Sequence, residues 1–185
     1  MTRRRPVGLI PLLVGAAIAG AGAYVGKHGL DPGKPSQYLL GQATVVDGDT
    51  LVVQGRKVRL IGIDAPETDQ DCGSPSGNYG CGVEARRHLV KLIGALPVMC
   101  DGKQDDRYGR LLAVCVVGGR DLNAAMVRDG WAVSYRGNYR AEEQAARTAF
   151  SGLWSGDFVL PQDWRKATRG DASGDGGDIG DDYAL

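Results

Sequence analysis

Short apolar segments separated by turns characterise the chain between residues 42 and 63. Asp47-Gly48-Asp49, between two apolar runs, is a hairpin signal, and Gln54-Gly55-Arg56 marks a second turn. Pro66 ends the third run, because proline has no N–H group to donate to a sheet. The pattern therefore predicts three β-strands, at residues 43–46, 50–53 and 57–63.

Helical and strand patterns both occur after residue 82. Apolar side chains recur near helical spacing over residues 83–93, and Gly94 follows as a stop signal. Asp121 can cap another helix that ends at Gly130. We predict helices at residues 83–93, 122–129 and 141–150, and strands at residues 97–100, 111–117 and 131–134. Short strands with an interposed helix are typical of a small closed barrel of the OB type, so the expected fold class is α+β and mainly β.

The first 25 residues have the composition of an export sequence. Arg3, Arg4 and Arg5 precede an apolar run over residues 7–25. A basic start and an apolar stretch are typical of a secretory signal peptide, and a run of this length can also span a bilayer as a helical anchor. Both interpretations stay open. Either one places the rest of the chain in the periplasm or outside the cell, and a retained anchor would contact the membrane through residues 7–25.

Composition divides the remaining chain into three parts: a linker at 26–37, a domain at 38–165 and a tail at 166–185. Gly, Asp and Ser dominate the tail, which we predict to be flexible and acidic. The whole chain has 22 basic and 22 acidic residues, and residues 24–165, the part between the leader and the tail, are neutral. Tight non-specific nucleic-acid binders usually carry a basic field, so we expect this chain to hold nucleic acid only transiently, at a local site. We also expect a monomer.

The four cysteines form no C-x-x-C pair, which makes zinc binding a weak interpretation. An even number of cysteines in an exported chain favours disulfides. We favour Cys72–Cys81, which closes a short Gly/Ser/Pro loop, and Cys100–Cys115, which joins two predicted neighbouring strands. Buried free thiols are the alternative.

Three polar clusters stand beside predicted strand ends or loops. They are Asp47-Gly48-Asp49-Thr50, Arg59 with the later Asp64-Ala65-Pro66-Glu67, and Arg107-Tyr108-Gly109-Arg110. Each cluster taken alone is also compatible with an ordinary solvated turn. Taken together, they supply a coherent reaction centre for phosphodiester hydrolysis.

That reaction needs an activated water and neutralisation of charge on a five-coordinate phosphorus. Carboxylates at Asp49 and Asp64 can hold a hard cation, and the absence of a His or Cys cluster in the sequence favours calcium or magnesium over zinc. Glu67 is placed to accept a proton from water. Arg59 and Arg110 offer planar forks that match phosphate oxygens.

Strand parity leaves the geometry of this centre open. Arg59 and Asp64 are an odd number of residues apart, so an ideal strand would point them to opposite faces. Gly62 lies between them and could carry a bulge that makes the two side chains converge.

Five motifs, taken in order, resemble the staphylococcal-nuclease-like, or thermonuclease, family. They are VVDGDT at 45–50, VRLIGIDAPET at 58–68, YGR at 108–110, LNAAMVRDGWA at 122–132 and GLWS at 152–155. The resemblance covers roughly residues 40–160. It implies a five-stranded OB barrel with three helices, and calcium-dependent hydrolysis of DNA and RNA to 3′-phosphate products.

The resemblance also implies roles for individual residues. The catalytic residues would be Arg59, Glu67 and Arg110. The calcium ligands would be Asp49, Asp64 and the carbonyl of Ala65, where many family members have Thr. Substrate contacts would come from Arg107 and Tyr108 beside the phosphate and from Tyr135 stacked on a base.

Two other functions compete with a nuclease. One is an OB barrel that binds nucleic acid without cutting it, although such relatives usually lose a catalytic side chain and this chain keeps all three. The other is an oligosaccharide-binding module at the cell envelope. Sugar clefts usually need exposed aromatic side chains, and only 6% of this chain is aromatic.

Overall fold

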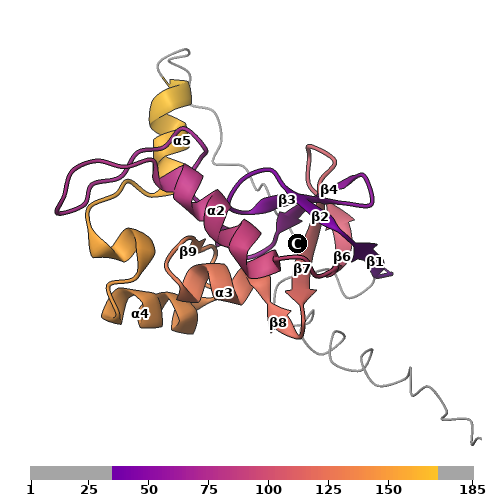
Figure 1. Cartoon of the computed structure of the whole chain (residues 1–185). Helices are drawn as coiled ribbons and strands as arrows, with labels where there is room; N and C mark the ends of the chain where they lie inside the picture. The colour runs from indigo at the N-terminus through magenta and orange to yellow at the C-terminus, as the bar shows by residue number, and fades with distance from the viewer. Residues whose placement is uncertain (1–34, 171–185) are drawn as a thin grey trace, which may run out of the picture.

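A computed structural model describes residues 35–170, with most strands at one end of the molecule and helices at the other (Figure 1). The predicted leader and most of the predicted linker lie outside these residues, as does the part of the tail after Gly170. Within residues 35–170, no helix is long and apolar enough to cross a membrane. The strands are β1 (Gln37–Gly41), β2 (Ala43–Val45), β3 (Thr50–Val53), β4 (Arg56–Leu60), β5 (Ile63–Asp64), β6 (Val98–Asp105), β7 (Leu111–Val117), β8 (Arg120–Asp121) and β9 (Val133–Ser134).

The larger sheet has the order β1-β6-β7-β4-β3-β2, with β8 beside β7. Its neighbours are antiparallel except β4 and β7, which run parallel. Only Gln42 separates β1 from β2, yet these strands lie at opposite ends of the order. The sheet therefore curls in an OB-like manner, and this segment links its two ends. Strands β5 and β9 pair separately.

The inner face of the curled sheet is apolar because polar and apolar residues alternate along its strands. In β4, Val58 and Leu60 are fully buried, whereas Arg59 between them is only partly covered. Helix α2 (Cys81–Ile93) covers this core with residues one helical turn apart, namely Ala85, Leu89 and Ile93. The nearly fully buried helix α3 (Leu122–Arg128) starts at Asp121, whose side chain accepts a hydrogen bond from the Ala124 N–H at 3.0 Å.

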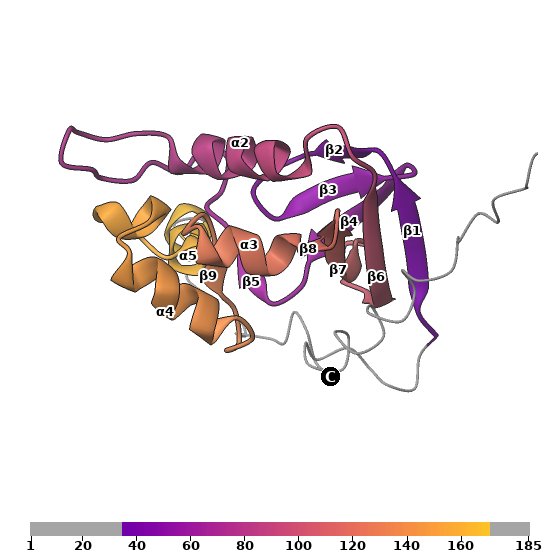
Figure 2. The same ribbon diagram turned by 60° about the horizontal axis from the view of Figure 1, so that its bottom comes forward.

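Two further helices, α4 (Arg140–Thr148) and α5 (Pro161–Gly170), follow β9 in the chain, with a short 3₁₀ turn at Gly152–Ser155 between them. Both helices lie at the end of the molecule away from β1, and α3 lies between α2 and α4 (Figure 2). This arrangement brings the C-terminal part of the described chain close to β5 and to the loop that precedes α2.

The predicted fold class, α+β and mainly β with an OB-like sheet, is confirmed. The structure has more strands than the five implied, because the first strand is broken at Gln42 and short pairs form at β5, β8 and β9. Strand β6 continues to Asp105, where the sequence predicts a polar segment. Helix α5 is a fourth helix, so Lys166–Gly170 are helical where a flexible tail is predicted.

Both predicted disulfides are present and include all four cysteines. Cys100 and Cys115 lie directly opposite each other on β6 and β7, with their Cα atoms 4.1 Å apart. Cys72 and Cys81 close the loop before α2, with a Cα separation of 5.6 Å. The first bridge therefore ties the sheet, and the second fixes a loop next to the polar clusters.

Candidate active site

The turn between β2 and β3 buries a carboxylate. Asp49 is only 2% exposed, and its backbone N–H donates to Asp47 Oδ1 at 3.0 Å. The Asp49 carboxylate accepts from Thr50 Oγ1 at 3.1 Å and from the Ala65 N–H at 2.9 Å. Gly48 permits this approach, because a Cβ there would stand 2.6 Å from the Ala65 Cβ. The turn thus holds one carboxylate against the segment that follows β5.

Arg59 joins Asp49 to Asp64. Its Nη1 donates to Asp49 Oδ1, and its Nη2 donates to Asp64 Oδ1 at 2.9 Å. Arg59 and Asp64 converge through a turn rather than the bulge suggested from strand parity, since Gly62, with φ at 80°, lies in the turn between the end of β4 and the start of β5. Only glycine suits this position, because that φ is unfavourable for other residues and a Cβ would lie 2.9 Å from the Asn138 Cβ.

An arginine from α5 completes this group. Arg165 Nη1 donates to Asp64 Oδ1 at 3.1 Å and to Glu67 Oε1 at 2.8 Å, and its Nη2 donates to Asp64 Oδ2 at 2.9 Å. We call these residues the carboxylate cluster: Asp49, Asp64, Glu67, Arg59 and Arg165. The side chains of Asp49 and Asp64 are 3% and 1% exposed, against 34% for Glu67. Glu67 is therefore the carboxylate that solvent reaches.

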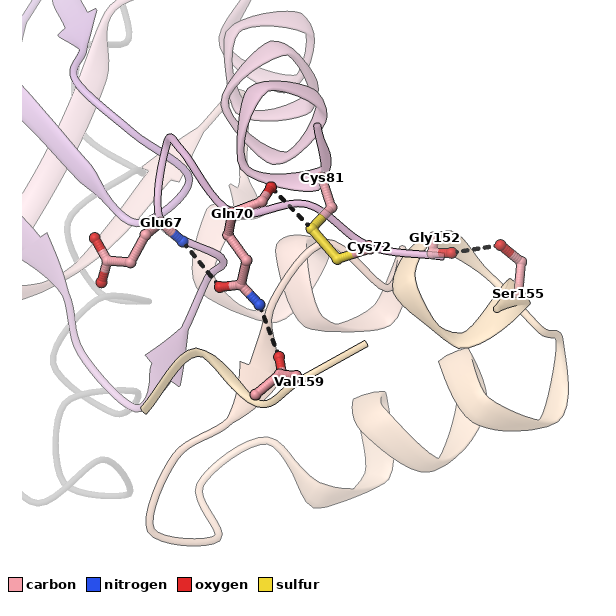
Figure 3. The surroundings of a disulfide bond; sticks show 7 residues. All are labelled: Glu67, Gln70, Cys72, Cys81, Gly152, Ser155 and Val159. Atoms are coloured by element: carbon pink, nitrogen blue, oxygen red, sulfur yellow. Dashed lines mark hydrogen bonds between the residues drawn. A yellow bond between two sulfur atoms is a disulfide. The ribbon is translucent and has the colours of Figure 1, made fainter. Parts of the chain in front are cut away.

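The backbone of Glu67 is held on two sides. Gln70 is fully buried, and its Oε1 accepts from the Glu67 N–H at 3.3 Å while its Nε2 donates to the Val159 carbonyl at 2.7 Å (Figure 3). On the other side, Gly82 of α2 packs so closely that a Cβ there would collide with the Glu67 carbonyl. The carboxylate thus extends toward solvent from a fixed backbone.

Arg110 directly precedes β7, the strand that runs parallel to β4. Arg59 pairs with Leu112 across the parallel β4–β7 pair, so Arg110 precedes the paired residue by two positions. The Arg110 Nε donates to Asp106 Oδ2 at 2.6 Å, and the side chain is 23% exposed. Of the predicted catalytic trio, Arg59 and Glu67 belong to one ion-pair network, whereas Arg110 is held by Asp106 at the start of the neighbouring strand β7.

The predicted substrate residues lie on two loops. Tyr108 is 60% exposed, and the guanidinium groups of Arg107 and Arg110 lie 4.9 and 5.4 Å from its ring centroid. An exposed ring flanked by cations can stack on a base while the cations face phosphate. Tyr135 follows β9, is partly exposed, and donates from its N–H to the Gly62 carbonyl at 2.9 Å. It therefore borders the turn that leads to Asp64.

Burial raises the pKa of the Asp49 carboxyl to about 8; the nearby Arg59 guanidinium opposes that rise, whereas the neighbouring carboxylates of Asp47 and Asp64 add to it. For Arg165, burial lowers the pKa, but the hydrogen bonds and charges of Asp64 and Glu67 outweigh burial and raise it above the usual value. In this cluster, burial disfavours the ionised carboxylates, and neighbouring cations stabilise them.

The donor atoms of the residues present are of the type that a hard divalent cation prefers. Asp49, Asp64 and the Ala65 carbonyl offer only oxygen donors, which calcium and magnesium prefer. Between residues 35 and 170, however, no three His, Cys, Asp or Glu side chains meet as a ready-made metal cage. The Asp49 and Asp64 oxygens are instead bonded to Arg59 and Arg165.

Sequence reasoning did not single out three residues that shape this site: Arg165, Gln70 and Asp106. Pro161 at the first helical position is a signal for α5 itself. No local pattern indicates that Arg165 reaches Asp64, which lies 101 positions earlier in the chain.

Comparisons with known proteins identify the family to which the chain belongs. The chain belongs to the family described as staphylococcal nuclease homologue, whose profile matches residues 57–156. It is 34% identical to the succinoglycan biosynthesis protein ExoI of Rhizobium meliloti (strain 1021), an alignment that covers 76% of this chain and 74% of that protein. It is 36% identical to a micrococcal nuclease of Shigella flexneri, with 68% and 79% covered.

Proposed function

We propose that this protein is a calcium-dependent endonuclease that hydrolyses DNA, RNA or both to 3′-phosphate products. Membership of the nuclease family, with relatives named micrococcal nuclease and thermonuclease, makes the chain a phosphodiester hydrolase. One observation supports this site as its centre. Arg59 gathers the buried carboxylates of Asp49 and Asp64, while Glu67 stands beside them with its carboxylate open to solvent.

In this proposal, Asp49, Asp64 and the Ala65 carbonyl would hold calcium, which when bound supplies positive charge against the phosphate. Glu67 takes a proton from the attacking water as the water oxygen bonds to phosphorus. The bond from phosphorus to the 5′ oxygen breaks, and that oxygen gains a proton from solvent, which leaves a 3′-phosphate on one product and a 5′-hydroxyl on the other.

The arginines have the complementary role. The forks of Arg59 and Arg110 donate to phosphate oxygens, and these bonds matter most as charge builds in the transition state. Tyr108, with Arg107 at its side, supports a neighbouring base and phosphate outside the reacting centre. Tyr135, which follows β9, stacks on a base in this proposal.

Digestion of labelled single-stranded DNA, double-stranded DNA and RNA by the purified full chain tests this function. We expect cleavage in calcium, products that end in 3′-phosphate, and no cleavage after chelation. Arg128→Gln should cleave as the wild type does and is the control for substitutions of Arg59 and Arg110, because Arg128 is exposed and pairs with Glu142 away from the cluster. Activity that persists in chelator would contradict the calcium requirement, and absence of cleavage on every substrate would contradict the nuclease.

A second candidate, oligosaccharide handling at the cell envelope, is favoured by a single observation. The relative from Rhizobium meliloti is named for succinoglycan biosynthesis. Binding of an acidic oligosaccharide by the full chain, with no cleavage of any nucleic acid, would favour this second function.

We also propose that the chain is exported, with its leader either cleaved or retained as a membrane anchor. The two disulfides support this compartment, because such bonds persist outside the reducing cytosol.

A further inference from the structure

Helix α5 brings a positive charge into the carboxylate cluster from outside the segment that matches the family. The family profile ends at residue 156, and α5 begins at Pro161. Arg165 is the residue of α5 that reaches inward, and it binds both Asp64 and Glu67. Its neighbour Lys166 is exposed and pairs with Asp163 on the same helix. Among residues 161–168, whose side chains the structure describes, the hydrogen bonds to the cluster therefore come from Arg165.

Residues 157–159, which precede α5, are bound to the segment that contains the Cys72–Cys81 bridge. The Gly73 N–H donates to the Asp157 carbonyl at 2.7 Å, and Gln70 donates to the Val159 carbonyl at the same distance. Phe158 packs edge-on against Trp154, with their ring centroids 4.9 Å apart. Three consecutive anchors, at residues 157, 158 and 159, thus precede α5, and Figure 3 shows the last of them, the hydrogen bond from Gln70 to Val159. Arg165 is therefore presented to the cluster by a fixed support.

Arg165 occupies the oxygens that a calcium ion would need. Asp64 Oδ1 accepts from both Arg59 and Arg165, and Oδ2 accepts from Arg165. A cation bonded to Asp64 would lie close to the Arg165 guanidinium, and like charges at such distances repel strongly in a partly buried site. The same arginine also holds Glu67 Oε1, the oxygen of the proposed base. Metal binding and the Arg165 contact are therefore in competition.

The formal charge of the carboxylate cluster also supports competition between calcium and Arg165. A calcium ligand must be ionised, and with all three carboxylates ionised and both arginines in place the cluster carries −1. With Arg165 withdrawn, the cluster carries −2, which a divalent cation neutralises.

We propose that α5 is an autoinhibitory element, in which Arg165 caps Asp64 and Glu67 and is displaced when calcium binds. The proposal rests on the proposed function and adds a regulation of the same site. Because coupling between two ligands is reciprocal, Arg165 weakens calcium binding, and calcium loosens α5 from the cluster. A chain with this cap remains inactive where free calcium is low.

Calorimetric titration of the full chain with calcium tests the proposal without measuring activity. Arg165→Gln should tighten calcium binding by about tenfold or more, the usual size of such a coupling. Arg165→Lys, which keeps the charge and loses the fork, should give a smaller gain. Lys166→Gln is the matched control on the same helix and should bind calcium as the wild type does. Hydrogen exchange in the wild type provides an independent measurement, since calcium should speed exchange of the backbone amides of residues 162–168, the part of α5 after Pro161.

Three outcomes would overturn the autoinhibitory role, and they differ in what else they overturn. Unchanged calcium affinity in Arg165→Gln with unchanged exchange in α5, while Asp49→Ala abolishes binding, would leave the calcium site intact. Loss of nucleic-acid affinity in Arg165→Gln at equal calcium affinity would make Arg165 a substrate contact instead. Equal calcium binding by the wild type, Arg165→Gln and Asp49→Ala would place the metal elsewhere, and the proposed calcium site would fail as well.

Discussion

Glu67 differs from Asp49 and Asp64 in being open to solvent, which is the reason for assigning it to water. Glu67→Gln keeps the size and hydrogen bonding of the side chain but removes its basic site. We expect kcat to fall by about 10²–10⁴-fold, the usual contribution of a general base. Substrate affinity should hold or increase, because one negative charge near the phosphate is gone.

Single-turnover cleavage and equilibrium binding of the same oligonucleotide separate these two effects. Arg110→Lys is the comparison, because it keeps the charge and loses the planar fork, and it should also lose turnover. Near-normal turnover in Glu67→Gln beside an inactive Arg110→Lys would show that Glu67 only orients the site.

Asp49 titrates within an accessible pH range. Its folded-state pKa of about 8 lies above the ordinary value of 3.8, so without a cation the protonated form of Asp49 is favoured below pH 8. The contribution of protonated Asp49 to folding stability is present in full below pH 3.8 and is lost as the pH rises through 8. A calcium ligand must be ionised, so calcium affinity should rise by roughly tenfold per pH unit below pH 8 and then level off.

Calorimetry from pH 6 to 9 measures this dependence. Titrations in two buffers of different ionisation enthalpy should show about one proton released per calcium near pH 7. Affinity that is independent of pH over this range would mean that Asp49 is already ionised before calcium binds.

Among the elements, α2 positions Glu67 through a close approach of backbones. Glycine in a helix is normally destabilising relative to alanine by about 0.5–1 kcal/mol, so Gly→Ala usually stabilises. At Gly82 the sign should reverse, because the added Cβ would collide with the Glu67 carbonyl. We expect Gly82→Ala to lower the free energy of unfolding by about 1–3 kcal/mol, the usual cost of overpacking, and to reduce kcat as Glu67 shifts.

Urea unfolding and kcat measurements check the Gly82→Ala prediction. Val83→Ala, at the exposed neighbouring position of α2, is the control and should change stability by less than about 0.5 kcal/mol. A Gly82→Ala protein as stable and active as the control would show that the loop yields without moving the base.

The two disulfides act on the molecule as a whole. Native protein should show no thiol that reacts with an alkylating reagent, and four thiols after denaturation and reduction. Removing Cys100–Cys115 by paired Cys→Ala substitutions should lower the free energy of unfolding by about 2–5 kcal/mol, measured with urea. Four reactive thiols in native material would contradict both the bridges and the proposed export.

Local pattern accounts for much of this fold. Apolar runs bounded by turns predicted strands β3 and β7, and helical spacing with capping and stop signals predicted α2, α3 and α4 to within two residues at each end. Both disulfide pairings followed from loop length and predicted strand neighbours. These features depend on residues close in sequence, where spacing and turn chemistry determine the conformation.

The motifs in the sequence identified Arg59, Asp49, Asp64 and Glu67 as one group. Only the tertiary structure showed how Arg59 and Asp64 meet, since the turn at Gly62 moves the chain into a second sheet. It also brought Arg165 to Asp64 over 101 positions, and Val159 to Gln70 over 89. Contacts of this range depend on how whole elements pack, and periodicity along the chain carries no information about which distant side chain will meet a given carboxylate.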